Sequence, residues 1–194
     1  MLRFFGVSMV VAALLVMSAV PALAGGPGKS VPIHGAVLTE GPPPDEGAPG
    51  CAADPFLIWR FSRVGTGELS HLGSVGIALT HCTYVVPDPS GAFHAVFRDG
   101  TLTFTADNGD TLDLAYVGTT EALMDAGGFI GYTGEGTWTA IGGTGRFTHA
   151  TGSGWFDLVG DVPGGDALFG LPDGFDRWAF GGRIAYDASD RSSK

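Results

Sequence analysis

The sequence is poor in positive charge and in side-chain amides. Lysine occurs only at Lys29 and Lys194, asparagine occurs once, and glutamine is absent. Ten basic side chains stand against twenty acidic ones, which gives a formal net charge of −10. A chain of this charge repels phosphate backbones, so the composition argues against nucleic-acid binding.

Known catalytic motifs are also missing. The chain contains no H-E-x-x-H zinc motif, no phosphate-binding loop and no dinucleotide fingerprint. Ser153 lies between two glycines, but the wider G-x-S-x-G frame of a nucleophilic serine is absent. The sequence therefore does not support a hydrolase, a kinase or a dehydrogenase, and we predict neither a cofactor nor a metal ion.

Long apolar runs are confined to the N-terminus. Arg3 precedes an apolar run from Phe4 to Val20, Pro21 interrupts it, and residues 22–24 (Ala-Leu-Ala) form a small-residue cleavage site. These features are typical of a secretory signal peptide, and a retained membrane anchor is the alternative. We expect cleavage after Ala24, which predicts a secreted, periplasmic or extracellular protein with no membrane segment in its mature form.

Only two cysteines occur, Cys51 and Cys82. An even number in an exported chain favours a disulfide bond. Closing the loop between them stabilises a fold by about 3–4 kcal/mol according to the chain-entropy account. A catalytic thiol is the alternative, but no motif surrounds either cysteine, and an exposed thiol is unprotected in an oxidising compartment.

Strand signals dominate from residue 51 onward. Apolar stretches alternate with turn signals at 87–91, at Asp99-Gly100 and at 107–110. Only Thr119–Ala126 has helical character, and no other segment shows a sustained 3.6-residue pattern of apolar residues. We predict an all-β fold, a closed antiparallel β-barrel of about eight strands. The predicted strands lie at 56–61, 69–86, 92–98, 101–105, 112–116, 129–134, 136–141, 153–160 and 177–186.

The chain divides into four predicted parts. A signal peptide (1–24) is followed by a Gly/Pro-rich, flexible arm or linker (25–50), in which only 31–38 is compatible with a strand. The β-barrel domain is expected at 51–187, and a C-terminal tail at 188–194.

A glycine-dense run from Gly142 to Gly154 joins two strand-like segments. Five glycines in thirteen residues indicate a sharp bend or a close backbone approach. One short turn there directs Phe147 inward and Arg146 outward. We interpret the run as a structural corner of the barrel, formed by Gly142, Gly143, Gly145, Phe147 and Gly152.

This corner resembles the strand–corner–strand element of the allene oxide cyclase and dirigent group. The matching positions are Gly142, Gly143, Thr144, Gly145, Phe147, Ala150 and Gly152. The segment 67–73 (Gly-Glu-Leu-Ser-His-Leu-Gly) is similar to one in bacterial secreted relatives of that group. The resemblance, over residues 52–187, implies an eight-stranded barrel whose lumen holds an apolar ligand, and homo-oligomers that are often trimers. It transfers no catalytic residue to this chain.

Histidines, tryptophans and one arginine are the candidates for ligand binding. His81 and His94 flank the turn at 87–91, and a regular hairpin would make them cross-strand neighbours. Such a pair can bind metal or shuttle protons, but without a third ligand we favour two half-buried histidines. Arg60 and Arg63 lie on opposite faces of one strand, and the inward one requires a carboxylate or an anionic ligand. The candidate residues are Trp59, Arg60, His81, His94, Trp138 and Trp178.

Two acidic segments have two interpretations each. Asp107, Asp110 and Asp113 could bind calcium, but the turn lacks the length and the closing Glu of an EF-hand loop, so a solvated hairpin turn is favoured. The segment 160–176 combines apolar and acidic side chains, which suits either a lid over one barrel mouth or a surface excursion.

Three functions remain open. The favoured one is a non-enzymatic exported barrel that binds a small apolar or amphipathic ligand or a protein partner. The alternatives are a lumenal isomerase or cyclase and a purely structural barrel. A lumen filled by its own side chains favours the structural protein, and an open apolar lumen favours ligand binding. An open lumen with a buried His or Arg near a carboxylate raises the case for the enzyme.

Overall fold

The computed structural model describes residues 29–42, 45–46, 50–52, 58–87, 93–161, 168–169, 171 and 174–187. The expected signal peptide and C-terminal tail lie outside this part of the chain. The described elements are β1 (Val31–Glu40), β2 (Asp45–Glu46), β3 (Ile58–Leu69), β4 (Gly73–Pro87), β5 (Phe93–Ala106), β6 (Thr111–Asp125), β7 (Gly128–Gly143), the short 3-10 helix η1 (Gly145–Phe147), β8 (Thr151–Asp161) and β9 (Phe175–Ala185).

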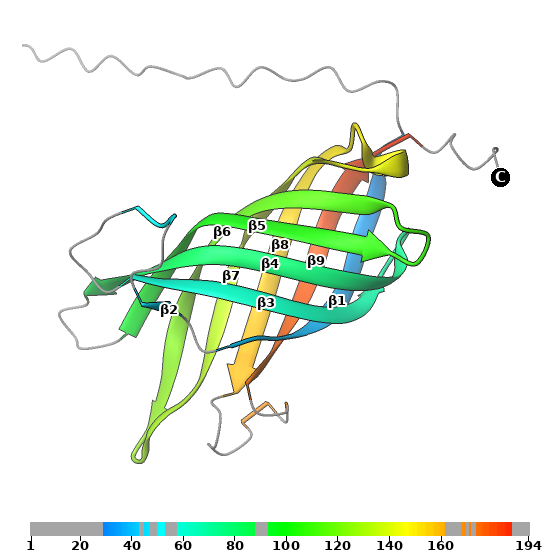
Figure 1. Cartoon of the computed structure of the whole chain (residues 1–194). Helices are drawn as coiled ribbons and strands as arrows, with labels where there is room; N and C mark the ends of the chain where they lie inside the picture. Colours follow the sequence, from blue (N-terminus) through cyan, green and yellow to red (C-terminus); the bar gives the residue numbers. More distant parts are fainter. Residues whose placement is uncertain are drawn as a thin grey trace, which may run out of the picture.

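Eight of the strands close into a barrel (Figure 1). Each pairs antiparallel with its neighbours, in the order β1-β9-β8-β7-β6-β5-β4-β3, and β1 then pairs with β3 to complete the ring. The two-residue β2 adds only a short pairing to the start of β3. The predicted closed antiparallel barrel of about eight strands is confirmed, and closure leaves no long unpaired edge among the strands that the structure describes.

The barrel begins earlier than the expected boundary at residue 51. Residues 31–40, expected within the arm, form β1, which pairs along its whole length with β9 and from Gly35 onward with β3. Ile33, Val37 and Thr39 of this strand point inward and are buried. Pro32 and the small residues between Ile33 and Val37 weaken the alternation of apolar and polar residues, which explains why the sequence gives only a weak strand signal here.

The Asp99-Gly100 hairpin prediction is wrong. The two residues form a bulge within the continuous strand β5, where the register shifts between Phe97 and Gly100. Asp99 has a left-handed backbone (φ 53°). The ring of Tyr116 lies against Gly100, 2.8 Å from the position of a Cβ there, so a side chain would not fit. An Asp-Gly pair in the sequence cannot distinguish a bulge from a hairpin turn, because both require a residue with a left-handed backbone.

The helix predicted over Thr119–Ala126 is also wrong. Strand β6 continues to Asp125 and pairs with β7, for example at Thr119 with Glu135. The Asp125 carboxylate closes the following turn by accepting hydrogen bonds from the backbone N–H groups of Gly127 and Gly128. The Glu-Ala-Leu-Met run has high helix propensity, but cross-strand pairing overrides it.

The glycine-dense corner packs one end of the lumen. Gly145 adopts a left-handed backbone (φ 56°) and starts η1, which buries Phe147 completely. The expected outward orientation of Arg146 is wrong, because its side chain is only 13% exposed and packs over the Phe147 ring, 4.8 Å from the centroid, and it donates a hydrogen bond to the His71 carbonyl at 2.8 Å. At this end the lumen is filled by large buried side chains, namely Phe104, Leu112, Leu114, Phe147 and Ile184. Figure 1 shows the corner and the β6–β7 hairpin at opposite ends of the barrel.

Cys51 and Cys82 form the predicted disulfide, with 5.7 Å between their Cα atoms. The bond attaches residues 50–52 to β4, and the Ala52 N–H donates to the Tyr84 hydroxyl at 3.1 Å. In the described part of the chain, no helix has the length and apolar character that a membrane crossing requires.

Candidate functional site

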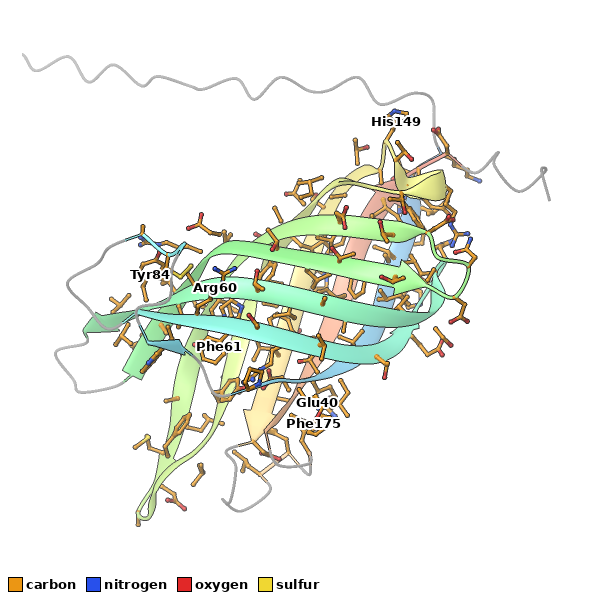
Figure 2. The ribbon with its side chains drawn as sticks, in the orientation of Figure 1. Glu40, Arg60, Phe61, Tyr84, His149 and Phe175 are labelled. Atoms are coloured by element: carbon orange, nitrogen blue, oxygen red, sulfur yellow. A yellow bond between two sulfur atoms is a disulfide. The ribbon has the colours of Figure 1, made fainter. Side chains whose placement is uncertain are left out.

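The half of the lumen away from the corner holds a cavity of about 590 Å³. Most of its wall is aromatic or aliphatic, and Figure 2 labels one of these side chains, Phe61 of β3. The principal apolar wall residues are Trp59, Phe61, Phe97, Phe129, Leu158 and Trp178. The lumen stays open at this end because Thr83, Thr120 and Ala122 occupy wall positions that larger side chains would fill.

A buried ion pair forms one side of the cavity. Arg63 of β3 donates from Nε to the Asp176 Oδ2 atom of β9 at 3.1 Å, and the two residues are only 9% and 4% exposed. Arg63 also donates from Nη1 to the Pro42 carbonyl at 2.9 Å. Tyr132 and Thr39 donate their hydroxyls to the Asp176 carboxylate. The inward arginine is therefore Arg63, and its partner is a carboxylate of the protein rather than an anionic ligand.

Two opposing effects set the protonation of this cluster. Burial raises the pKa of Asp176 above its ordinary value, while hydrogen bonding from Tyr132 and the charge of Arg63 act to lower it. Burial, then the charge of Asp176, raises the pKa of Tyr132. Tyr132 keeps its proton and is one of three side chains that donate to Asp176.

His81 is a neutral polar group in the same wall. It is 5% exposed and lies between the rings of Phe61 and Phe97, with centroid distances of 5.1 and 4.3 Å. Its Nδ1 atom is 2.7 Å from the Tyr116 hydroxyl. Burial, with a smaller contribution from the charge of Arg63, lowers the pKa of His81 to about 3. His81 therefore offers the cavity a hydrogen-bonding ring without a charge.

Two buried polar atoms in wall residues have no hydrogen-bond partner among the described residues. They are the hydroxyl oxygen of Thr83 and the indole nitrogen of Trp178. An unpaired buried donor of this kind costs about 1–3 kcal/mol. Both atoms are closed off from the cavity, so the wall presents the apolar parts of these two side chains.

Asp161 closes the end of β8 beside the cavity. It is 3% exposed and accepts hydrogen bonds from the backbone N–H groups of Phe169 and Leu171, both at 2.9 Å. This carboxylate attaches the described part of the β8–β9 connection to the barrel. About half of the segment 160–176, for which a lid and a surface excursion were equally open, lies outside the described residues.

The structure separates the six candidate site residues. Trp59, His81 and Trp178 line the cavity. Trp138 belongs to the packed core, 2% exposed, and donates its indole N–H to the Trp155 carbonyl at 3.0 Å. Arg60 alternates with Trp59 and Phe61 and lies beside Gly50, outside the lumen.

The predicted pairing of His81 with His94 is wrong. His94 is opposite Val86, and its side chain is 40% exposed and 3.6 Å from Glu121. His81 falls between the register positions of Thr80 and Cys82, opposite the β5 bulge. The β4–β5 hairpin is centred near residue 90 rather than between 87 and 88, and this offset moves the two histidines apart.

The predicted acidic turn is closed by its own hydrogen bonds. The Asn108 amide donates to Asp110, Thr103 donates to Asp113, and Arg146 lies 3.6 Å from Asp110. These contacts fit the favoured hairpin turn.

The sequence does not indicate Tyr132 or Thr39 as parts of the site, and it places Asp176 only within the long acidic segment, without a partner. Tyr132 reaches Asp176 from β7, across β8, where Gly160 leaves room for its ring. Nothing in the local sequence could indicate these contacts, because they depend on the register of four strands.

No known protein family, no curated protein and no solved structure matches this chain. Its class is therefore defined only by its fold and its site. The protein is a closed eight-stranded antiparallel barrel with one packed end and one open apolar end, and the open end contains a buried ion pair.

Proposed function

We propose that this protein binds a small, mostly apolar molecule in the open half of its barrel. The cavity carries the proposal, because its volume of about 590 Å³ and its aromatic wall with a few polar groups suit such a ligand. The packed end alone supplies a core, so a purely structural barrel would not need an open lumen.

We also propose an exported protein related to the allene oxide cyclase and dirigent group. The signal-like sequence of residues 1–24 and the Cys51–Cys82 disulfide support export. The eight-stranded barrel with a glycine-dense corner supports the kinship. A homo-oligomer, trimeric in that group, is part of the same proposal, and native mass spectrometry of the exported protein tests both subunit number and cleavage after Ala24.

The binding test uses the fluorescent apolar probe N-phenyl-1-naphthylamine. We expect saturable binding with enhanced emission, because the probe leaves water for an apolar enclosure. The variant Ala122→Phe fills part of the cavity and should weaken probe binding by about tenfold or more, since an occupied lumen excludes the probe sterically. The matched control is Thr119→Phe, because Thr119 lies on the same strand but is exposed.

The two variants separate lumenal binding from adsorption to the surface. Equal loss of binding in both would exclude the cavity as the site, and absence of saturable binding in the unsubstituted protein would refute the proposed function. Thermal unfolding of each variant checks that the barrel remains folded.

A lumenal isomerase or cyclase is the second candidate. The observation that favours it is a buried Arg63 with the Asp176 carboxylate, near His81, in an open lumen. Such an enzyme would act by confining its substrate and by hydrogen bonding to it. Mass spectrometry of a compound extracted from the exported protein, followed by incubation with fresh protein, tests turnover. Conversion by the unsubstituted protein that is lost in Arg63→Met would support the enzyme.

A further inference from the structure

One ring nitrogen of His81 faces the cavity without a partner. The ring is 5% exposed, lies among the inward side chains of the wall, and uses its Nδ1 atom for the contact with Tyr116. The Nε2 atom has no hydrogen-bond partner among the residues that the structure describes. It is also not one of the closed-off polar atoms without a partner, which belong to Thr83, Arg146 and Trp178. Nε2 is therefore accessible, and the space beside it is the lumen.

The hydrogen bonds of Tyr116 decide which ring nitrogen carries the proton. The Tyr116 hydroxyl lies 2.7 Å from His81 Nδ1 and 3.4 Å from the carbonyl oxygen of Thr80, which can only accept. Burial, then the charge of Asp176, raises the pKa of Tyr116, so the hydroxyl keeps its proton. When this hydroxyl donates to Thr80 and accepts from the Nδ1–H group, both contacts are hydrogen bonds. The opposite tautomer would leave the contact with Thr80 without a proton.

The ring of His81 is neutral at pH 7, because burial lowers its pKa to about 3. With the single ring proton on Nδ1, the Nε2 atom keeps its lone pair and can only accept a hydrogen bond. The rings of Phe61 and Phe97 lie on either side of the imidazole, with centroids at 5.1 and 4.3 Å. This packing fixes the direction of the acceptor before a ligand enters.

The other polar groups of the wall select less sharply. Asp161 accepts hydrogen bonds from two backbone N–H groups, and Asp176 accepts them from three side chains of the protein. The Thr120 hydroxyl, also in the wall, can donate or accept, so it serves a ketone as well as an alcohol. An acceptor-only nitrogen distinguishes a ligand that carries a donor from one that does not.

We propose that His81 is the specificity-determining residue of the cavity, and that its Nε2 atom accepts a hydrogen bond from the hydroxyl group of a mostly apolar phenol or alcohol. This inference rests on the proposed function, because it specifies the ligand of the same cavity. The aromatic wall encloses the apolar body of the ligand, and the ligand hydroxyl supplies the donor that Nε2 lacks. A buried acceptor without a donor is unfavourable, so the pairing favours binding.

Three compounds that share one ring system test the inference by equilibrium dialysis. They are naphthalene, 2-naphthol and 2-methoxynaphthalene, used at about pH 7, where a phenol keeps its proton. The methoxy compound has the same oxygen atom as the phenol but lacks the donor. We expect 2-naphthol to bind at least about threefold more tightly than 2-methoxynaphthalene, which is the effect of one net hydrogen bond.

His81→Phe removes the acceptor and keeps a ring between Phe61 and Phe97. The affinity of 2-naphthol relative to 2-methoxynaphthalene should fall by at least about fivefold, because the buried hydroxyl then has no acceptor. The matched control is Thr120→Val, which removes a hydroxyl from the same wall with little change of shape. It should leave this ratio unchanged within about twofold.

Nitrogen-15 NMR of the histidine-labelled, unsubstituted protein reads the ring directly. The chain has five histidines, and the His81 signals are assigned through the contact with Tyr116. We expect a protonated Nδ1 and an unprotonated Nε2. The Nε2 signal should move toward the position of a protonated nitrogen when 2-naphthol binds, and much less when 2-methoxynaphthalene binds. A purely structural histidine would not show this difference.

The outcomes separate this inference from the proposed function. A proton on Nε2 overturns the inference, and so does 2-methoxynaphthalene if it binds as tightly as 2-naphthol. Loss of the preference in Thr120→Val but not in His81→Phe also overturns it. In each case the cavity still binds apolar molecules. If none of the three compounds and no N-phenyl-1-naphthylamine binds, the proposed function itself fails. The measurements on the unsubstituted protein decide the question even if His81→Phe does not fold.

Discussion

Gly160 is the position at which a single methyl group should break the buried cluster. The Tyr132 ring crosses β8 at this glycine, and a Cβ placed there would lie 2.2 Å from Cζ and 2.5 Å from the hydroxyl oxygen of Tyr132. Neither Gly160 nor Gly181 has a left-handed backbone, so alanine is tolerated by the main chain at both. Gly160→Ala must therefore move Tyr132 away from Asp176.

The expected loss of stability follows from two contributions of the Tyr132 side chain, its hydrogen bond to Asp176 and the packing of its ring. A hydrogen bond to a charged group contributes about 1.5–3 kcal/mol, and displacement of a packed ring adds about 1–3 kcal/mol. We expect Gly160→Ala to lower the free energy of unfolding by about 3 kcal/mol. For a domain of this size that corresponds to a decrease in Tm of roughly 6–12 °C.

Gly181→Ala is the matched control for this prediction. A Cβ at Gly181 would also meet an aromatic ring, at 2.5 Å from Trp155, but that ring is 49% exposed and is free to turn into solvent. Both substitutions restrict the unfolded chain equally, so that effect cancels. We expect Gly181→Ala to change stability by less than about 1 kcal/mol, because only an exposed ring has to move.

Urea denaturation of the oxidised proteins, followed by far-ultraviolet circular dichroism, measures both variants. If the two free energies of unfolding agree within about 0.5 kcal/mol, the Tyr132–Asp176 contact does not contribute as argued, and the buried cluster loses its structural support. A crystal structure of Gly160→Ala with Tyr132 in its original place would have the same consequence.

Two further predictions concern the disulfide and His81. The double variant Cys51→Ala/Cys82→Ala should unfold with a free energy lower by about 3–4 kcal/mol in urea, because the loop between the cysteines is no longer closed; an unchanged value would contradict this. His81 has a pKa of about 3 in the fold and an unfolded value of 6.5, so its contribution to stability is complete above 6.5 and is lost as the pH falls toward 3. Between about pH 6.5 and 4.5 the unsubstituted protein should therefore lose about 2–3 kcal/mol more than His81→Gln, and parallel pH profiles would show that His81 titrates normally.

The fold was predictable because its signals are local. Alternating strands, tight turns and the glycine-dense corner around Gly145 together indicate a closed barrel, and two cysteines behind a signal-like N-terminus indicate a bridge. Two of the wrong predictions share one cause. Asp99-Gly100 and Thr119–Ala126 carry local preferences, for a turn and for a helix, that long pairings with neighbouring strands override.

The candidate site was predictable only in part, because it depends on register. The alternation of β3 places Trp59 and Arg63 inward together and Arg60 outward, as the sequence allows. The partner of Arg63 comes from a strand more than a hundred residues away, and a shift of one residue in β9 would turn Asp176 to the other face. A single sequence contains no record of that register.

The division of the lumen explains how one barrel can be both stable and open. At the corner end, Phe104, Leu112 and Phe147 fill the space and supply a dense apolar core. At the other end, the small side chains of Thr120 and Ala122 do not fill the lumen, so other contacts must keep the walls of the barrel apart. The Arg63–Asp176 pair bridges β3 and β9 beside the cavity and receives Tyr132 from β7. The polar cluster therefore supports the opening of the lumen.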